Sequence, residues 1–365
     1  MRLIIVICSA ALLVACSESA PGTEAQIEQW TVPLEPDVVL ESDAEGNDLF
    51  DIRGLAMFAD GAAAIMHASL GNLLFTDRKG EIIASFGRKG GGPGEFNMPE
   101  IVGLVDGDTV SVWDSRLGRF HHIARHGGFR TFRPLQWTGR RAPVAVGGER
   151  ALTASSTIGR FEPGRQRFPQ TWRLRFAETG EGPVLAELEV SDFFTIQNNG
   201  GPATTLLIPL AARPVGTLSR GRAYLANGAE KVVRVFDADG VELEPLMLPW
   251  LPSLPVTDEM FLEAMRDEAG AEPSPELLNL VPLEERLPAI AGLKADSEGR
   301  LWIRSFPVPA EPSVDWWVIR PDGSLVAQVR IPASVQVEAV SSDFIWGVTL
   351  DEYEVERVVR YPVAR

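Results

Sequence analysis

The chain has 365 residues, and its 34 lysines and arginines are outnumbered by 50 aspartates and glutamates, which gives a net charge of −16. Nucleic acids and anionic lipid surfaces attract proteins through a basic footprint, so this balance excludes both as partners of the folded body. The length beyond the N-terminal segment is sufficient for one large domain.

Residues 1–15 predict a secretory signal peptide, because Met1 and Arg2 precede an apolar run that is too short to span a bilayer. The run ends in Leu-Val-Ala and then Cys16, which resembles the bacterial lipobox. In proteins with that box the cysteine is acylated, with palmitate among its chains, and becomes the first mature residue. We therefore expect lipidation at Cys16. The alternative is an ordinary secreted protein with a chance cysteine at the cleavage site.

Ser17 follows the expected anchor, where lipoproteins retained at the inner membrane tend to carry aspartate, so the resemblance implies an outer membrane lipoprotein of the cell envelope. Residues 16–28 would form the lipidated cysteine and a flexible tether, because they are mostly small and polar. The membrane would then be contacted through the lipid anchor only. With Cys8 removed and Cys16 acylated, the body has no thiol, which excludes disulfides and cysteine-based sites.

Residues 29–365 predict an all-β fold, a six-bladed β-propeller. Six stretches can be superimposed so that one matched position, six places after the start of an outward strand, carries a small polar residue or a histidine. Repeats of roughly 40 to 50 residues made of short strands are typical of propellers. The matched residues are His67, Asp114, Ser155, Asn227, Ser305 and Thr349.

Glycines mark the hairpins between third and fourth strands of five units, at Gly80, Gly127, Gly180, Gly240 and Gly323. The sixth unit ends after its third strand, at residues 355–363. We expect the N-terminal segment at residues 29–39 to supply the missing outer strand and close the ring.

Long insertions fall in the loops that a propeller places on one face, at residues 86–99, 157–169, 191–213, 245–288 and 306–312. Because loops on a rigid scaffold usually carry function, this face is the expected binding face. The longest insertion predicts a short helical segment around residues 257–280, with Thr257 as N-cap and Gly270 at the end of the first helix. Its apolar stripe, which includes Phe261 and Met265, either seats the insertion or binds a partner.

The segment from Phe86 to Phe96, FGRKGGGPGEF, and the strand VSVWD that ends at Asp114 resemble the linker and repeat of NHL-type propellers. The chain is similar to bacterial lipoproteins with a single six-bladed propeller, over residues 29–365. That resemblance implies the fold and offers no established catalytic residues to carry over.

The matched polar residues allow two interpretations. Aspartate, asparagine, serine and threonine can cap the turn that follows the second strand, which needs no ligand. Alternatively, His67 and Asp114 lie on the binding face as acid, base or metal ligands of an enzyme. His67 fits the capping interpretation least well, because imidazole is a poor turn cap.

A second set of positions lies eight residues before each second strand, where the inner strands begin. Arginines there would form a positive patch at the channel mouth that could hold a carboxylate or phosphate. The alternative is salt bridging between blades, for example between Glu100 and Arg53. The charged members of the set are Arg53, Glu100, Arg141 and Arg213.

The remaining candidates predict neither a catalytic centre nor a metal or cofactor site. The glycine-rich residues 89–94 lack the Gly-Lys-Ser order of a phosphate loop, and a crossover between blades explains them. His121 and His122 alternate along a strand and cannot chelate one metal together.

The sequence therefore favours a monomeric, non-catalytic propeller that binds an unknown protein or a small anionic ligand on its loop-rich face. The alternative is a hydrolase or lyase, lactonase-like or metal-dependent, with its site at the channel mouth. A purely structural envelope component is the third possibility.

Overall fold

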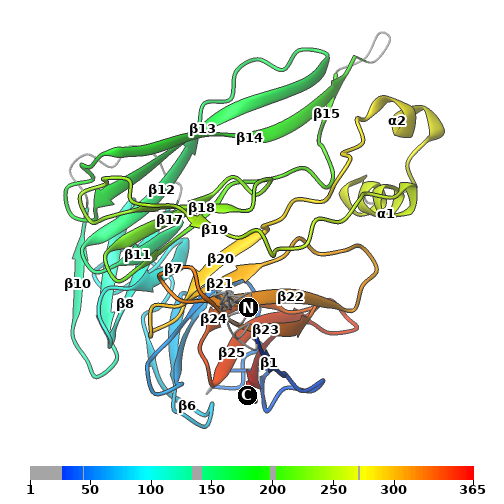
Figure 1. Ribbon diagram of the computed structural model, residues 1–365. Helices are drawn as coiled ribbons and strands as arrows, with labels where there is room; N and C mark the ends of the chain where they lie inside the picture. Colours follow the sequence, from blue (N-terminus) through cyan, green and yellow to red (C-terminus); the bar gives the residue numbers. More distant parts are fainter. Residues whose placement is uncertain (1–26, 44, 134–141, 198–202, 270–271) are drawn as a thin grey trace, which may run out of the picture.

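The computed structural model describes residues 27–365, except 44, 134–141, 198–202 and 270–271 (Figure 1). The predicted signal peptide, Cys16 and most of the tether therefore lie outside the described residues. None of the helices that the structure describes is long and apolar enough to cross a membrane.

The described chain is an all-β propeller in which short antiparallel strands follow one another from the axis outward. The first sheet has the order β3–β4–β5–β6, and a separate sheet has the order β16–β17–β18–β19. Their bounds are β3 (Ile52–Met57), β4 (Ala63–His67), β5 (Asn72–Thr76), β6 (Ile82–Phe86), β16 (Val215–Ser219), β17 (Arg222–Ala226), β18 (Val232–Phe236) and β19 (Leu246–Met247).

A nine-stranded sheet lies between these two, in the order β10–β9–β8–β7–β11–β12–β13–β14–β15. Its strands are β7 (Pro99–Leu104), β8 (Thr109–Asp114), β9 (Arg119–Ala124), β10 (Phe129–Phe132), β11 (Ala145–Gly147), β12 (Arg150–Ser156), β13 (Gly164–Phe176), β14 (Val184–Ile196) and β15 (Thr204–Leu207).

The last two sheets each include a strand from the N-terminal segment. One has the order β1–β23–β22–β21–β20 and the other β2–β26–β25–β24. Their bounds are β1 (Glu28–Trp30), β2 (Val38–Leu40), β20 (Gly292–Ala295), β21 (Leu301–Arg304), β22 (Ser313–Ile319), β23 (Leu325–Pro332), β24 (Gln336–Val340), β25 (Phe344–Leu350) and β26 (Glu356–Pro362).

The expectation of six separate four-stranded sheets is not met, because the described residues form five sheets. The second and third units merge where β7 pairs in parallel with β11, Gly103 opposite Val146. Gly103 has a φ of +140°, and a Cβ atom there would collide with the Val146 carbonyl. The glycine therefore allows the two backbones to approach within hydrogen-bonding distance.

The first strands of successive units neighbour one another in a closed circle, in the order β3, β7, β11, β16, β20, β24 and back to β3. The hydrophobic core lies between neighbouring sheets, since each sheet buries both of its faces. Along β4, Ala64 and Met66 pack toward the second unit, whereas Ala63 and Ile65 pack toward the last one. This two-sided burial explains why inner and second strands have nearly continuous apolar sequences.

The N-terminal segment pairs with the last unit, since Val38, Val39 and Leu40 of β2 pair antiparallel with β26. The pairing is reinforced by Asp37, whose carboxylate accepts hydrogen bonds from the Arg360 guanidinium at 3.0 and 2.6 Å. Upstream, Glu28 to Trp30 form an additional parallel edge on β23, which the sequence analysis did not anticipate.

The insertions predicted as loops at residues 157–169 and 191–213 are partly strands. Residues 164–169 of β13 pair with 189–195 of β14, and β15 pairs with the end of β14. We call residues 164–169, 189–196 and β15 the arm, which extends beyond the disc in Figure 1. Two insertions pair because each satisfies the backbone hydrogen bonds of the other.

The predicted helical insertion contains α1 (Asp258–Ala269) and α2 (Pro275–Leu280). Thr257 caps α1 through a 3.2 Å hydrogen bond from the Met260 amide, while the expected end of that helix, Gly270, lies outside the described residues. Phe261 and Met265 are buried, and their cluster includes Phe194 and Leu206 of the arm. The apolar stripe therefore seats the insertion, mainly on the arm.

The Asp37–Arg360 pair gives a test of the role of the N-terminal strand. Arg360 is 5% exposed, whereas Asp37 is partly open to solvent, so Asp37→Ala should remove a charged hydrogen-bond partner of a buried guanidinium and lower the free energy of unfolding by about 2 kcal/mol. The measurement is urea denaturation followed by tryptophan fluorescence.

Asp343→Ala is the matched control, because Asp343 pairs with Arg365 at 3.2 Å on the surface. Such a pair contributes at most about 1 kcal/mol. Equal effects of the two substitutions would contradict a special role for the N-terminal strand.

Candidate functional site

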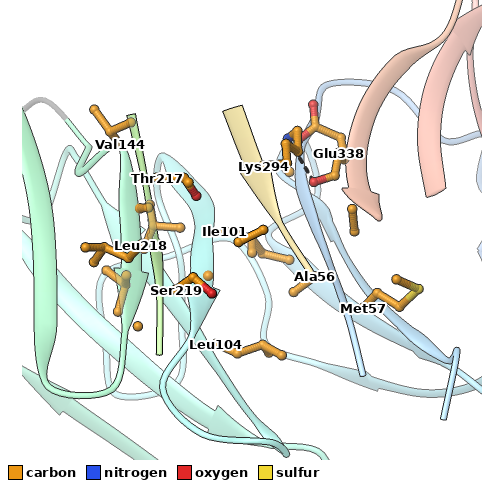
Figure 2. Close-up of a pocket in the computed structure, with 18 of the residues that line it drawn as sticks. Ala56, Met57, Ile101, Leu104, Val144, Thr217, Leu218, Ser219, Lys294 and Glu338 are labelled. Carbon is orange, nitrogen blue, oxygen red and sulfur yellow. Dashed lines mark hydrogen bonds and ion pairs between the residues drawn. The ribbon is translucent and has the colours of Figure 1, made fainter. Parts of the chain in front are cut away.

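A channel of about 1240 Å³ runs along the propeller axis between the innermost strands. Its walls are about equally polar and apolar, and Ala56, Ile101, Leu104 and Leu218 are among the apolar side chains that Figure 2 shows around it. Because the inner strands start on the loop-rich face, residues at their beginnings lie at the mouth on that face. The channel is the default candidate for a binding site.

Two of the predicted residues, Arg53 and Glu100, line this channel. Arg53 does not pair with Glu100 as the salt-bridge alternative expected. Its Nε lies 2.7 Å from the Asp51 carboxylate, on the same strand segment. The two inner strands lie close together because Gly54, with a φ of +91°, faces the Ile101 carbonyl, which would be 2.9 Å from any Cβ atom.

Sequence reasoning missed further charged residues of the channel, and two of them, Lys294 and Glu338, form a pair on the inner strands. Lys294 of β20 donates a 2.8 Å hydrogen bond to the Glu338 carbonyl of β24, and its Nζ lies 3.5 Å from the Glu338 carboxylate. Figure 2 shows this pair above Ile101 and Ala56. In the fifth and sixth units the positions eight residues before the second strand are Ala291 and Val335, each three residues before the charged residue that lines the channel. In the sequence, a charged residue inside an otherwise apolar inner strand would have indicated the positions of Lys294 and Glu338.

Glu100 differs from the other charged side chains of the mouth, because no ion pair holds it among the residues described. Its side chain is accessible from the channel, yet surrounding protein raises the pKa of its carboxyl group. Burial is the largest cause and the charge of Glu338 adds to it, while Arg53 opposes the shift. The mouth therefore holds a carboxyl group that gains a proton more readily than one in water.

Three predicted residues are not brought to the channel, and Arg141 lies outside the described residues. Arg213 is exposed on the loop before β16, and Pro214 separates it from the strand. His67 and Asp114 end second strands, whose side chains point into the junctions between units because the inner strands stand between them and the axis. The expected positive patch is thus corrected to a mouth with nearly balanced charges.

Asp114 holds its own turn and the preceding crossover together. Its carboxylate accepts hydrogen bonds from the backbone amides of Asn97 at 2.7 Å, Leu117 at 2.9 Å and Arg116 at 3.1 Å. This geometry supports the capping interpretation. The glycine-rich crossover is fixed similarly, since the guanidinium of buried Arg119 donates to the carbonyls of Gly92 and Glu95 at 2.8 and 2.9 Å.

His67 is completely buried at the junction of the first and last units, with Phe50 edge-on at 5.5 Å between ring centroids. Neither ring nitrogen has a hydrogen-bond partner in the described part of the chain. Burial lowers the pKa of His67, and the charges of three carboxylates oppose this shift, those of Asp43, Asp51 and Glu356. The imidazole is therefore neutral and shielded, which is unsuited to proton transfer in the channel.

His121 and His122 face different neighbours, as the strand alternation predicts. Nε2 of His121 accepts a 3.1 Å hydrogen bond from Arg119, and its Nδ1 lies 3.0 Å from the Thr131 hydroxyl. Burial lowers the pKa of each histidine to about 4. Across the described ranges, no group of three His, Cys, Asp or Glu residues is arranged to hold a metal ion.

No family model matches this chain, and no curated protein matches it. Among solved structures, it is similar to a member of the DUF4221 family from Bacteroides vulgatus, with 10% identity and a TM-score of 0.43 over 93% of this chain and 98% of that one. Virginiamycin B lyase from Staphylococcus aureus shares 10% identity, with a TM-score of 0.36 over 92% and 94%. Regucalcin, a calcium-binding protein from Agrobacterium tumefaciens, shares 11%, with 0.35 over 86% and 90%. At such values the likenesses carry no argument about what this chain binds.

The unpartnered imidazole of His67 generates a first prediction. His67→Leu should raise the free energy of unfolding at neutral pH by about 1 kcal/mol, because it removes a buried polar group that has no partner. The pKa of His67 is lower in the folded protein than in the unfolded chain. The stability linked to its neutral form is therefore fully present at pH values above the pKa of the unfolded chain, and it is lost as the pH falls through the pKa of the folded protein. The variant should therefore lose less stability in acid.

Urea denaturation across this pH range checks both effects. His126→Leu is the control, since His126 is exposed in the hairpin after β9. A marked loss of stability in His67→Leu at neutral pH would contradict the prediction and reveal a partner for the imidazole.

Glu100 generates a second prediction, with the opposite sign. Its pKa is higher in the folded protein than in the unfolded chain. The stability that Glu100 contributes is therefore present at pH values below the pKa of the unfolded chain, and it is lost as the pH rises through the pKa of the folded protein. Glu100→Gln should therefore be more stable than the wild type at neutral pH, and the difference should shrink in acid. Exposed Glu352→Gln is the control, and an unchanged stability profile for Glu100→Gln would refute the assignment.

Proposed function

We propose that this chain is a membrane-anchored propeller lipoprotein that binds a ligand or protein non-catalytically on its loop-rich face. The observation that carries the proposal is the channel, whose wall is about equally polar and apolar and includes the charged residues Arg53, Glu100, Lys294 and Glu338. Concave sites with a few placed polar groups are where proteins usually bind small molecules. The arm and the helical insertion add contact surface on the same face.

In this proposal the propeller has six blades and is closed by the N-terminal strand. The nine-stranded sheet divides between β7 and β11 into two units, each starting at the axis. β2 then provides the outer strand of the last blade. A closed ring keeps the channel mouth in fixed geometry, which a binding site requires.

The charges of the mouth favour a neutral ligand over the expected anion. Asp51 neutralises Arg53, and Glu338 neutralises Lys294. Glu100 adds an acidic group that would repel an anion whenever it is ionised. A protein partner reaching this face remains compatible with the same arrangement.

A hydrolase or lyase is the second candidate, because Glu100 supplies one feature that such an enzyme needs. A carboxyl group with a raised pKa in a cavity is suited to act as a general acid. Hydrolysis of a panel of γ- and δ-lactones near neutral pH tests it. Turnover that Glu100→Gln abolishes would establish the enzyme and overturn the non-catalytic proposal.

The anchor is tested by Cys16→Ser. If Cys16 is acylated, the substitution should abolish labelling with radioactive palmitate and release the protein from the membrane fraction. Cys8→Ser is the matched control, because Cys8 would leave with the signal peptide. Unchanged labelling of Cys16→Ser would contradict the lipoprotein assignment.

The binding site is tested by native mass spectrometry of the full-length protein purified from its own envelope in mild detergent. We expect a bound small molecule that is lost in the Arg53→Ala, Glu100→Gln double variant. Arg213→Ala should retain it, because Arg213 lies outside the channel lining. Equal retention by all three proteins would move the site away from the mouth, and a bare wild type would contradict ligand binding.

A further inference from the structure

Arg304 is the last residue of β21 and lies at the loop-rich end of the fifth unit, outside the lining of the channel. β21 begins at Leu301, after the tight turn on the opposite face, and the insertion at residues 306–312 follows its end. Trp302 and Trp316 belong to the buried cluster that the fifth unit shares with the sixth. Because Arg304 follows Trp302 by two residues and lies opposite Trp316 in the register, its side chain faces the same junction.

The inner strand leaves room for this side chain. Gly292 of β20 lies opposite Arg304, and a Cβ atom on Gly292 would be 3.3 Å from Cβ and 3.6 Å from Cδ of the arginine. The methylene stem of Arg304 therefore lies across the first residue of the inner strand, where a larger residue would crowd it.

The guanidinium group of Arg304 has no hydrogen-bond or ion-pair partner among the described residues, in contrast to buried arginines elsewhere in the propeller. Arg300 pairs with Asp296 at 2.7 Å, and Arg360 pairs with Asp37 at 2.6 Å. The nitrogen atoms of Arg304 are not among the fully buried ones that lack a partner, so they are open to solvent. A ligand can therefore reach them.

Burial affects this cation without any compensating charge. Arg304 is half-buried, and burial lowers the pKa of its guanidinium, with no neighbouring charge contributing to the shift. An arginine side chain nevertheless stays protonated at neutral pH. Glu338, a carboxylate of the same junction, is already engaged by Lys294 at 3.5 Å and by the Gln336 amide at 2.6 Å. The junction thus holds an uncompensated positive charge that is partly removed from water.

The missing partner of such a cation is an anion, because a charge that has lost part of its hydration is costly unless an opposite charge accompanies it. A carboxylate fits best, since parallel N–H groups of a guanidinium meet its two oxygens. It also carries a single negative charge. A phosphate dianion would leave one negative charge over, in a protein whose net charge is already −16.

We infer that Arg304 binds the carboxylate group of a small organic acid at the loop-rich end of the junction between the fifth and sixth units. The site lies outside the channel lining, so the inference goes beyond the proposed function and does not depend on it. The nearly balanced charges of the channel mouth concern the other site. No covalent step is involved.

The test is isothermal titration calorimetry of the full-length protein in mild detergent with sodium benzoate and with benzamide. The two probes have similar shapes, and only benzoate carries a negative charge. Benzoate should bind the wild type about tenfold more tightly than benzamide does, and about tenfold more tightly than it binds Arg304→Gln, because either change removes a charged hydrogen-bonded pair. Arg213→Gln is the matched control, since Arg213 is exposed on the same face, and it should bind benzoate as the wild type does.

Benzoate that binds Arg304→Gln as tightly as the wild type, or that binds the wild type no better than benzamide, would overturn the inference. Inorganic phosphate distinguishes the two classes of oxyanion. Tighter binding of phosphate than of benzoate, lost in Arg304→Gln, would show that the assignment to a carboxylate is wrong.

Urea denaturation of Arg304→Met gives a second measurement, which carries the test if Arg304→Gln does not fold. The substitution keeps an apolar stem and removes the uncompensated charge, so it should raise the midpoint in buffer without carboxylates. Benzoate should raise the midpoint of the wild type, because it binds the folded state, and leave that of the variant unchanged. A variant that unfolds at a lower urea concentration than the wild type would reveal a partner of Arg304 within the protein and contradict the inference.

The outcome is separable from that of the proposed function, because the Arg53→Ala, Glu100→Gln variant leaves Arg304 in place. A natural ligand that this variant loses, together with no benzoate binding at Arg304, refutes the carboxylate site alone. Benzoate binding at Arg304 in a protein that carries no natural ligand leaves the carboxylate site standing and contradicts the channel proposal.

Discussion

The close approach of the inner strands is the constraint on which the rest of this structure depends. Gly54 meets the backbone of Ile101, and Gly103 meets that of Val146, at distances that exclude any side chain. These contacts set the width of the channel and bring the first three units into register. A wider spacing would open the junctions between sheets, where the apolar side chains of both faces are buried.

The same geometry decides which polar residues are available to a ligand. Side chains of the inner strands project into the channel, whereas those at the ends of second strands are taken into the junctions. Asp114 is consequently used to hold a crossover, and His67 is buried without a partner. The charges that remain at the mouth nearly cancel, so shape and hydrogen bonding, more than net charge, would select a ligand.

The unpartnered polar atoms lie in two kinds of place. Those of Gln170 and Trp172 belong to residues beside the channel, whereas His67 lies in a closed junction. Each costs stability while it lacks a partner, because a buried polar group that makes no hydrogen bond has lost its contact with water.

The sequence by itself determined the all-β class, the positions of the glycine hairpins, the face that carries the insertions and the cap of α1. These features follow from local patterns, namely turn residues, strand alternation and capping side chains. It also placed Arg53 and Glu100 on the channel. Only the tertiary structure decided that Asp51 pairs with Arg53, that Lys294 meets Glu338 and that two insertions pair to form the arm. The Lys294–Glu338 contact joins two units and the arm joins two insertions, and the placement of the inner-strand side chains depends on the small shifts of register that bulges introduce into β3, β7 and β24. A bulge moves later side chains along the strand without leaving a clear local signal, so counting along the chain could not locate them.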